Sequence, residues 1–239
     1  MNLRQLISDV KDVRSIPRLE IDLNRHSTAD NAPFFFQVVD EFYRSATGLH
    51  PRFPLVQFLQ YGVAVNVLPK NNDAYLKTLE PSARRNIRKA QRNGCRFARI
   101  QYNDHLADIG DIHRSAPVRQ GPMAESLLQD DPVPINNPVS KTSAHDYPYF
   151  GVVKDGQIVA YAGCLVAGEM LLLATVFGHR AHQKNGVVPL LIAGIADYIY
   201  ANYPGVKYYV YDKYYGASPN LRRFKKKFGF APCVVRWRF

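Results

Sequence analysis

The sequence predicts a mixed α/β fold in which helices flank a mostly antiparallel sheet. Its clearest signal is a hairpin over residues 149–167, where two apolar segments flank Asp155-Gly156, a dipeptide typical of two-residue turns. A second tight turn leads into the apolar strand 170–177. The next apolar segment, 187–201, is long enough for a helix and precedes a strand at 206–211. These elements define the centre of the predicted sheet.

The rest of the chain is expected to add elements whose ends are marked by proline and glycine. Pro33 begins a helix that Gly48 ends, and Pro81 begins another that Gly94 ends, because proline fits a first helical turn and glycine the left-handed stop. Alternating apolar and polar residues indicate short strands. The expected helices are 2–13, 33–47, 73–79, 81–93, 106–115, 119–128 and a short basic one ending at Gly229, and the strands are 19–23, 53–60, 62–68, 95–101 and 231–239.

The domain organisation expected from length and composition is one compact unit. Residues 1–70 are predicted to form an N-terminal extension packed on a larger domain, 71–239, and 239 residues suit this arrangement. Residues 129–148 are rich in Pro, Asn, Asp and Ser and are expected to form a loop that carries specificity.

The charge balance and the cysteine content narrow the class of protein. A formal net charge of +11 indicates partners that carry phosphate, although a basic protein without such a partner has the same composition. The three cysteines are too scattered for a disulfide framework or a metal site, which favours a reducing compartment. No apolar run approaches a membrane span or a signal peptide. The sequence therefore predicts a cytoplasmic protein without a metal.

The segment that follows the strand 170–177 is typical of an anion-binding site. A polar loop ends at Gly186 and opens directly into the helix that begins at Val187. The first amides of a helix have no intrahelical acceptor, and the helix dipole favours negative charge there. Gln183 and Lys184 are expected to contact the anion by their side chains, and Asn185, Gly186 and Val187 by backbone amides.

The predicted helix 81–93 carries a second basic surface. Ala83, Ile87 and Ala90 form a narrow apolar stripe, and cations cover the rest of the helix. Like charges this close repel each other unless an anion lies nearby, so the helix is either a phosphate-binding surface or a solvated basic face. The cations are Arg84, Arg85, Arg88, Lys89 and Arg92.

Several of these segments resemble one superfamily of enzymes. Gln-Lys-Asn-Gly at 183–186 resembles the start of the Gln/Arg-x-x-Gly-x-Gly/Ala loop with which GNAT acyltransferases bind the diphosphate of coenzyme A, although Val188 stands where that loop has Gly or Ala. Phe-Lys-Lys-Lys-Phe-Gly at 224–229, preceded by Asp212 and Gly216, resembles the Fem-type peptidyltransferases of the same superfamily, as does the basic segment 84–90. The resemblance extends over roughly residues 60–239.

The resemblance implies a GNAT-like twisted sheet and roles for individual residues. Thr175, Val176 and Phe177 are expected to line the acyl arm of the donor, with a backbone amide of this strand meeting the acyl carbonyl. Lys225 occupies the position of a general acid, where the Fem-type branch has lysine, and an ammonium there stabilises an oxyanion. Asp212 is expected to orient the acceptor amine or to pair with Lys225, and Tyr214 follows it in the same loop.

The function that the resemblance implies is transfer of an acyl group from acyl-CoA, with acetyl-CoA as the leading donor, to an amine of a small molecule. Arg119, Glu125 and Asp146 are expected to bind the acceptor. The alternatives left open are an aminoacyl-tRNA or acyl carrier protein as donor, and a non-catalytic module that binds phosphate or RNA. Fem-type enzymes usually contain two GNAT-like units, and this chain is too short for two.

Overall fold

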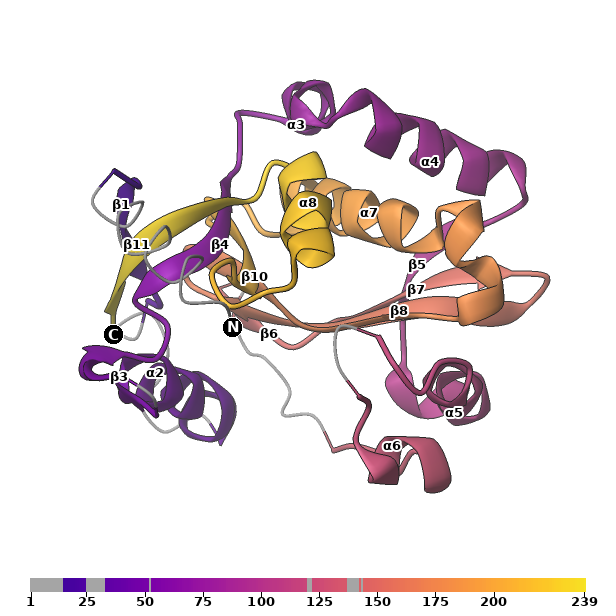
Figure 1. Ribbon diagram of the computed structural model, residues 1–239, viewed down its shortest axis with the longest axis horizontal. Helices are drawn as coiled ribbons and strands as arrows, with labels where there is room; N and C mark the ends of the chain where they lie inside the picture. The colour runs from indigo at the N-terminus through magenta and orange to yellow at the C-terminus, as the bar shows by residue number, and fades with distance from the viewer. Residues whose placement is uncertain (1–14, 25–32, 52, 120–121, 137–141, 143) are drawn as a thin grey trace.

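A computed structural model describes residues 15–24, 33–51, 53–119, 122–136, 142 and 144–239 of the protein. The helix expected over residues 2–13 lies outside the described residues. Within them, one large sheet forms the centre of the molecule, with helices on both faces (Figure 1). The mixed α/β fold predicted from the sequence is confirmed.

The sheet contains nine of the described strands, and its path runs in the order β1-β11-β4-β10-β9-β8-β7-β5, with the short strand β6 paired to β8. Strands β1 and β11 pair in parallel, as do β9 and β10, and the other pairs are antiparallel. The strands of the sheet are β1 (Arg18–Asp22), β4 (Tyr61–Val67), β5 (Arg96–Ile100), β6 (His145–Asp146), β7 (Tyr149–Lys154), β8 (Gln157–Ala167), β9 (Met170–Gly178), β10 (Tyr208–Lys213) and β11 (Ala231–Arg238).

The two faces of the sheet are covered by different helices. One face, called here the α7 face, is covered by α3 (Asn72–Thr78), α4 (Pro81–Arg92), α7 (Val187–Asn202) and α8 (Pro219–Lys227) (Figure 1). The opposite face, the α5 face, is covered at one end by η2 (Phe35–Val39) and α2 (Asp40–Thr47) and at the other by α5 (Leu106–Arg114) and α6 (Glu125–Gln129). The remaining elements are the hairpin β2 (Leu49–His50) and β3 (Phe53–Gln57), η3 (Tyr102–His105) and η4 (Arg180–Asn185).

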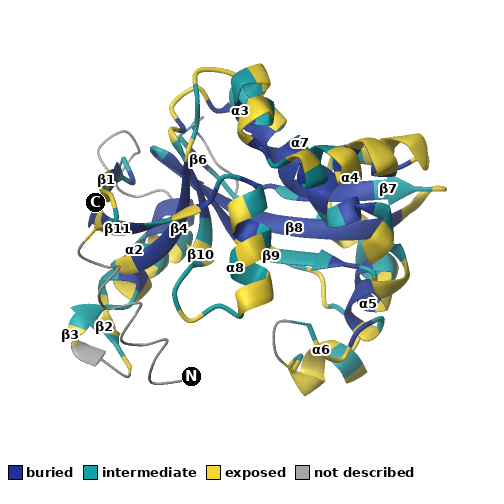
Figure 2. Ribbon diagram, turned by 45° about the horizontal axis from the view of Figure 1, so that its top comes forward, coloured by how far each residue is buried: buried dark blue, intermediate teal, exposed yellow. Residues whose placement is uncertain are grey.

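The hydrophobic core divides between these faces because neighbouring residues of a strand point to opposite sides. In β9, Leu171 and Leu173 join the core under α7, whereas Met170 and Leu172 join the core under α2. Helix α7 is buried on most sides, and β8 is buried along nearly its whole length (Figure 2). This double coverage explains why residues 157–177 and 187–201 read as almost continuously apolar.

Several expected elements differ in extent from the prediction, and the strand expected over 53–60 ends at Gln57 and pairs with β2 outside the large sheet. The helix expected over 119–128 is confined to Glu125–Gln129, and an isolated bridge joins Val118 to Pro122 before it. The strand expected from Val206 begins at Tyr208, because Val206 and Lys207 still belong to the turn that brings the chain back to Glu169.

Candidate active site

The strands β9 and β10 diverge in the middle of the sheet. They pair only from Tyr208 opposite Met170 to Val210 opposite Leu172. Strand β9 continues, paired to β8 alone, as far as Gly178. We call residues 173–178 of β9 and 211–213 of β10, beyond the last shared pair, the fork. Ala174 and Thr175 are exposed although β9 is a central strand, so solvent reaches the sheet there.

Lys225 places its ammonium in this fork. Its side chain is only 1% exposed, and Nζ donates hydrogen bonds to the carbonyl oxygens of Tyr211 and Lys213, each at 2.6 Å. Both carbonyls belong to the part of β10 that β9 no longer pairs. The ammonium also lies 4.5 Å from the centre of the Tyr211 ring. Burial lowers the pKa of Lys225 to about 8, and the negative charge of Asp212 opposes this shift.

Asp212 and Tyr214 have structural surroundings that the sequence does not reveal. Asp212 is exposed, adopts a left-handed backbone with φ of 48°, and forms no ion pair with Lys225 in the described part of the chain. It is the extra residue of a bulge, because Val210 opposes Val65 whereas Lys213 opposes Val63. The amide of Tyr214 donates to the carbonyl of Gly62, which ties the following loop to β4.

A second bulge lies on the other arm of the fork. Thr175 opposes Gly163 and Leu173 opposes Cys164, so Ala174 is an extra residue in β9. The hydroxyl oxygen of Thr175 accepts a hydrogen bond from the amide of Gly163, at 3.1 Å. Val176 packs toward the core under α7, and Phe177 packs toward α5. The residues predicted to line the acyl arm of the donor, Thr175 to Phe177, therefore lie on the β9 side of the fork.

The side chain of Tyr149 lies over Gly163 on the α5 face of this arm. A Cβ built on Gly163 would lie 2.9 Å from Cε1 of Tyr149 and 2.9 Å from Oγ1 of Thr175. The absence of a side chain at Gly163 thus lets the tyrosine ring reach across β8 toward the exposed Thr175. Neither residue was predicted as a site residue, because an isolated glycine and tyrosine in a strand carry no local signal.

The loop before α7 leaves two backbone amides without a protein acceptor in the described part of the chain, and one of them belongs to the buried Val187. Gly186 already donates to the carbonyl of Gln183, and Leu190 donates to that of Gly186. Pro189 has no N–H group, so the amides of Val187 and Val188 are the ones without an acceptor among the described residues. The predicted diphosphate contacts lie in η4 just before them: the side chains of Gln183 and Lys184 are exposed and that of Asn185 is half-buried.

Val188, which departs from the GNAT loop pattern, is accommodated by a second glycine. A Cβ built on Gly178 would lie 2.6 Å from Cγ2 of Val188. The valine side chain therefore occupies the space that Gly178 leaves empty at the end of β9, and it packs on the core there.

The structure gives a reason of its own for a glycine at position 186. The sequence-based expectation is that Gly186 lets a phosphate approach the backbone. Gly186 has φ of +79°, and a Cβ there would lie 2.2 Å from the carbonyl oxygen of Asn86 in α4. Nearby, Nζ of Lys89 donates to the carbonyl of Lys184 at 2.8 Å. Gly186 is required for the contact between α4 and the loop.

The three residues predicted to bind an acceptor are not brought together. Arg119 donates to the carbonyl of Gly178 at 2.7 Å and also to that of Ile112, and its buried Nε has no partner in the described part of the chain. Glu125 is exposed on α6 and accepts a hydrogen bond from Gln129. Arg119 thus connects the end of β9 to α5 through hydrogen bonds.

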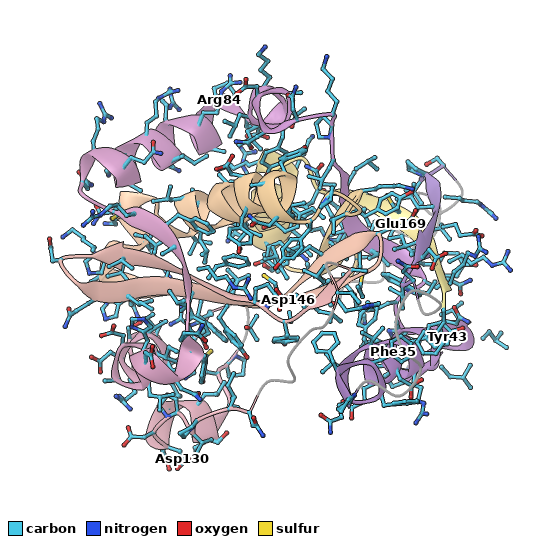
Figure 3. All side chains as sticks on the ribbon, turned by 180° about the vertical axis from the view of Figure 1, so that it is seen from behind. Phe35, Tyr43, Arg84, Asp130, Asp146 and Glu169 are labelled. Atoms are coloured by element: carbon cyan, nitrogen blue, oxygen red, sulfur yellow. The ribbon has the colours of Figure 1, made fainter. Side chains whose placement is uncertain are left out.

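Asp146, the third of these residues, belongs to a separate network. Its Oδ2 accepts hydrogen bonds from Arg99, at 3.0 Å, and from the hydroxyl of Tyr203, at 2.7 Å. Its position at the sheet, away from α6, is visible in Figure 3. The carboxylate links β5 to the end of α7 and is occupied by these partners.

Helix α4 has the two faces that its sequence predicts. Ala83, Ile87 and Ala90 are buried, and the cations lie on the outer side, which is exposed in Figure 2. Arg84 is half-buried and donates to the carbonyl of Lys77. Because α4 packs on α7 and contacts the loop at Gly186, its basic face lies beside the start of α7. The exposed cations are Arg85, Arg88, Lys89 and Arg92.

Metal-binding groups and membrane-spanning helices were sought throughout the described residues. These residues contain no group of three or more His, Cys, Asp or Glu side chains placed to hold a metal ion. Among the described helices, none has the length and apolarity needed to cross a bilayer.

Comparisons with known proteins identify relatives by structure alone. No family model and no curated protein matches the sequence. FemX is 12% identical, with a TM-score of 0.56 over 72% of this chain and 59% of that one. The C-terminal domain of a protein described as a lysylphosphatidylglycerol synthetase, from Agrobacterium fabrum, is 17% identical over 72% of this chain and 58% of that one, with a TM-score of 0.47. A GCN5-related N-acetyltransferase from Kribbella flavida is 13% identical over 72% and 54%, with a TM-score of 0.40.

The chain spans less than two thirds of the length of each of these structures. At such identities the likeness concerns the fold. The sequence resemblance rests on the loop that opens α7 and on the lysine of α8, and this lysine lies where β9 and β10 diverge. The chain shares its fold with FemX.

Proposed function

We propose that this protein transfers an acyl or aminoacyl group from an activated ester or thioester to an amine. The observation that carries the proposal is the Lys225 ammonium in the fork, bonded to two carbonyls of β10. Two of its N–H groups are engaged there, which leaves a third for the oxygen of a reacting carbonyl. A buried cation stabilises a developing oxyanion more strongly than one in water.

The reaction follows from the placement of the groups around the fork. The donor lies on the α7 face, with its phosphate at the amides of Val187 and Val188 and its acyl carbonyl beside Thr175. The attacking amine forms the new C–N bond, and the carbonyl oxygen carries negative charge until the C–S or C–O bond of the donor breaks. Lys225 donates a hydrogen bond to that oxygen or a proton to the leaving group, and solvent takes the proton that the amine loses.

Acyl-CoA is the leading donor, because a diphosphate suits two amides at a helix start flanked by Gln183 and Lys184. Aminoacyl-tRNA is the second candidate, and α4 is the observation that favours it. Its exposed cations extend from the loop along a 12-residue helix, which is about 18 Å long and exceeds the length of one diphosphate.

A panel of donors tests the function and separates the two candidates. We expect thermal stabilisation of the full chain by acetyl-CoA, or by charged tRNA in a salt-sensitive manner, and an acylated amine in mass spectra of the reaction. If the four exposed cations of α4 neutralise four phosphates, we expect the affinity for tRNA to fall about 100-fold between about 50 and 200 mM salt. Stabilisation without any product would indicate a binding module, and no response to either donor would contradict the proposal.

The pH dependence of turnover reports on Lys225. Burial lowers the pKa of Lys225 to about 8, so the ammonium is present below that pH and lost above it. We therefore expect kcat to fall as pH rises through about 8. Unfolding restores the ordinary pKa of 10.5 and takes up a proton, so stability rises with pH between about 8 and 10.5. A kcat that stays flat to pH 10 would contradict a charged catalytic lysine.

A further inference from the structure

The bulge in β10 turns Lys213 to the α5 face of the sheet. In a regular strand Lys213 would share the face of Tyr209 and Tyr211, which pack under α7. Because Asp212 is an extra residue, Lys213 instead opposes Val63, whose side chain lies in the core of the α5 face. Asp212 has φ of 48°, a conformation that costs non-glycine residues energy. Bulges of this kind re-aim side chains next to active sites.

The same bulge serves both lysines of the fork. The carbonyls of Tyr211 and Lys213 hold the ammonium of Lys225 on the α7 face. The side chain of Lys213 leaves the strand toward the α5 face, where its Nζ lies 3.2 Å from the centre of the Phe58 ring. One ammonium therefore lies on each face of the sheet at the point where β9 and β10 diverge.

The ammonium of Lys213 is held in place but has unused hydrogen-bond donors. The ring of Phe58 attracts the cation through its π-electrons and offers no hydrogen-bond acceptor. Across the described ranges, no carboxylate lies within salt-bridge distance of Nζ, and no oxygen accepts from it. Burial also lowers the pKa of Lys213. The charge of the neighbouring Asp212 opposes this shift but forms no ion pair with Nζ in the described part of the chain. A partly desolvated cation without an ion-pair partner is suited to bind an anion from a ligand.

Lys213 lies on the side of the fork from which the acceptor is expected to approach. Thr175 on β9 and Lys213 on β10 each lie three positions beyond the last pair, Leu172 with Val210. Thr175 opposes Gly163 and Lys213 opposes Val63, so both side chains point to the α5 face. The donor occupies the α7 face at α7 and α8. An amine that attacks the carbonyl in the fork must then approach from the α5 face, between the cores under α2 and α5.

We propose that Lys213 binds an anionic group of the acceptor, a carboxylate or a phosphate, and so selects amines that carry one. This inference rests on the proposed function for the identity of the ligand as an acceptor. The site itself consists of the ammonium of Lys213, the ring of Phe58 that holds it, and the exposed Thr175 across the fork.

Anion binding is tested without turnover, by NMR of the full chain labelled with ¹³C at lysine Cε. The probes are inorganic phosphate and acetate, and the Lys213→Met spectrum identifies the Lys213 signal. We expect a saturable shift of this signal with at least one probe, while the exposed Lys226 shifts little and without saturation. Should the signal of Lys213 move no more than that of Lys226 with both anions, the proposal is overturned. The probe that causes the larger shift of the Lys213 signal shows whether the site prefers a carboxylate or a phosphate.

Selectivity is tested with matched acceptors once a donor has been identified. Each amino acid or peptide is compared with its C-terminal amide, and each amino phosphate with its amino alcohol. Hydrogen bonds to charged groups predict a preference of about tenfold or more in kcat/KM for the anionic member. Lys213→Met should abolish the preference, whereas Lys226→Met should retain it. A retained preference would overturn the proposal.

Two controls keep these outcomes separate. Met keeps a long unbranched side chain at position 213, and Lys213→Gln is a second variant that keeps polarity if Lys213→Met loses stability. Lys226→Met removes an exposed charge from α8 and should change neither readout. If no amine is acylated by any donor, the proposed function fails, whereas the NMR titration still decides whether Lys213 binds anions.

Discussion

Lys225→Met is expected to lower kcat by about 100- to 1,000-fold, with little change in the affinity for the donor. Removal of a single oxyanion-stabilising donor has this effect in acyl-transfer enzymes. The ammonium of Lys225 lies in the fork and away from the amides of Val187 and Val188, which are expected to hold the phosphate of the donor. The loss should therefore appear in the chemical step and leave binding intact.

The fold should survive this substitution because two effects oppose each other. Methionine leaves the carbonyls of Tyr211 and Lys213 without the partner that Lys225 provides. It also removes a charge that burial destabilises, as the lowered pKa of Lys225 indicates. The rise in stability between pH 8 and 10.5 should disappear in the variant, since the group that takes up the proton is gone.

The measurement is single-turnover kinetics with the donor found in the panel, together with isothermal titration of that donor. Lys226→Met is the matched control, because Lys226 is the next residue of α8 and is exposed. We expect the control to retain kcat within about twofold. Equal rates for Lys225→Met and Lys226→Met would remove Lys225 from the mechanism.

Gly186→Ala is expected to reduce the free energy of unfolding by about 3 kcal/mol or more. Two costs combine at this position. The backbone has φ of +79°, which residues with a Cβ adopt only at an energetic cost. The new Cβ would also lie 2.2 Å from the carbonyl oxygen of Asn86, a backbone atom that moves only if α4 moves.

Gly94→Ala separates these two costs. Gly94 also has φ of +79°, but nothing lies within 4 Å of a Cβ built there. The control should lose about 1–2 kcal/mol from backbone strain alone. Urea denaturation of both variants measures the difference, which reports on the contact between α4 and the loop. Equal losses at the two positions would show that α4 does not press on Gly186.

The local patterns of the sequence predict the elements around the site well. Asp155-Gly156 specifies the hairpin of β7 and β8, because a two-residue turn with positive φ needs such residues. The stripe of Ala83, Ile87 and Ala90 is the buried side of α4, as its helical spacing predicts. Helical and strand periodicities are local properties, and so they can be read from neighbouring residues.

The bulges could not be predicted in the same way. Alternation in β10 would place Lys213 with Tyr211, and an inserted residue reverses this without any change of composition. Whether a strand bulges depends on the partner strand, here β4, which is more than 140 positions away in the chain. The second lysine of the fork was missed for this reason.

The hydrogen-bond partners of long polar side chains also could not be predicted from the sequence. Arg119 and Asp146 were predicted to bind a carboxylate or an amine of the acceptor. In the structure Arg119 binds the carbonyl of Gly178, and Asp146 binds Arg99 and Tyr203. These contacts join residues from 47 to 59 positions apart, so their existence depends on how the elements pack.

By itself, the sequence determined the order of the elements, the polar loop before α7 and the lysine of α8, because each depends on residues adjacent in the chain. Only the tertiary structure decided that Lys225 lies in the fork, that Lys213 faces the opposite side, and that Gly186 accommodates α4. The physical reason is that burial, register and the supply of hydrogen-bond partners arise from distant segments packing together.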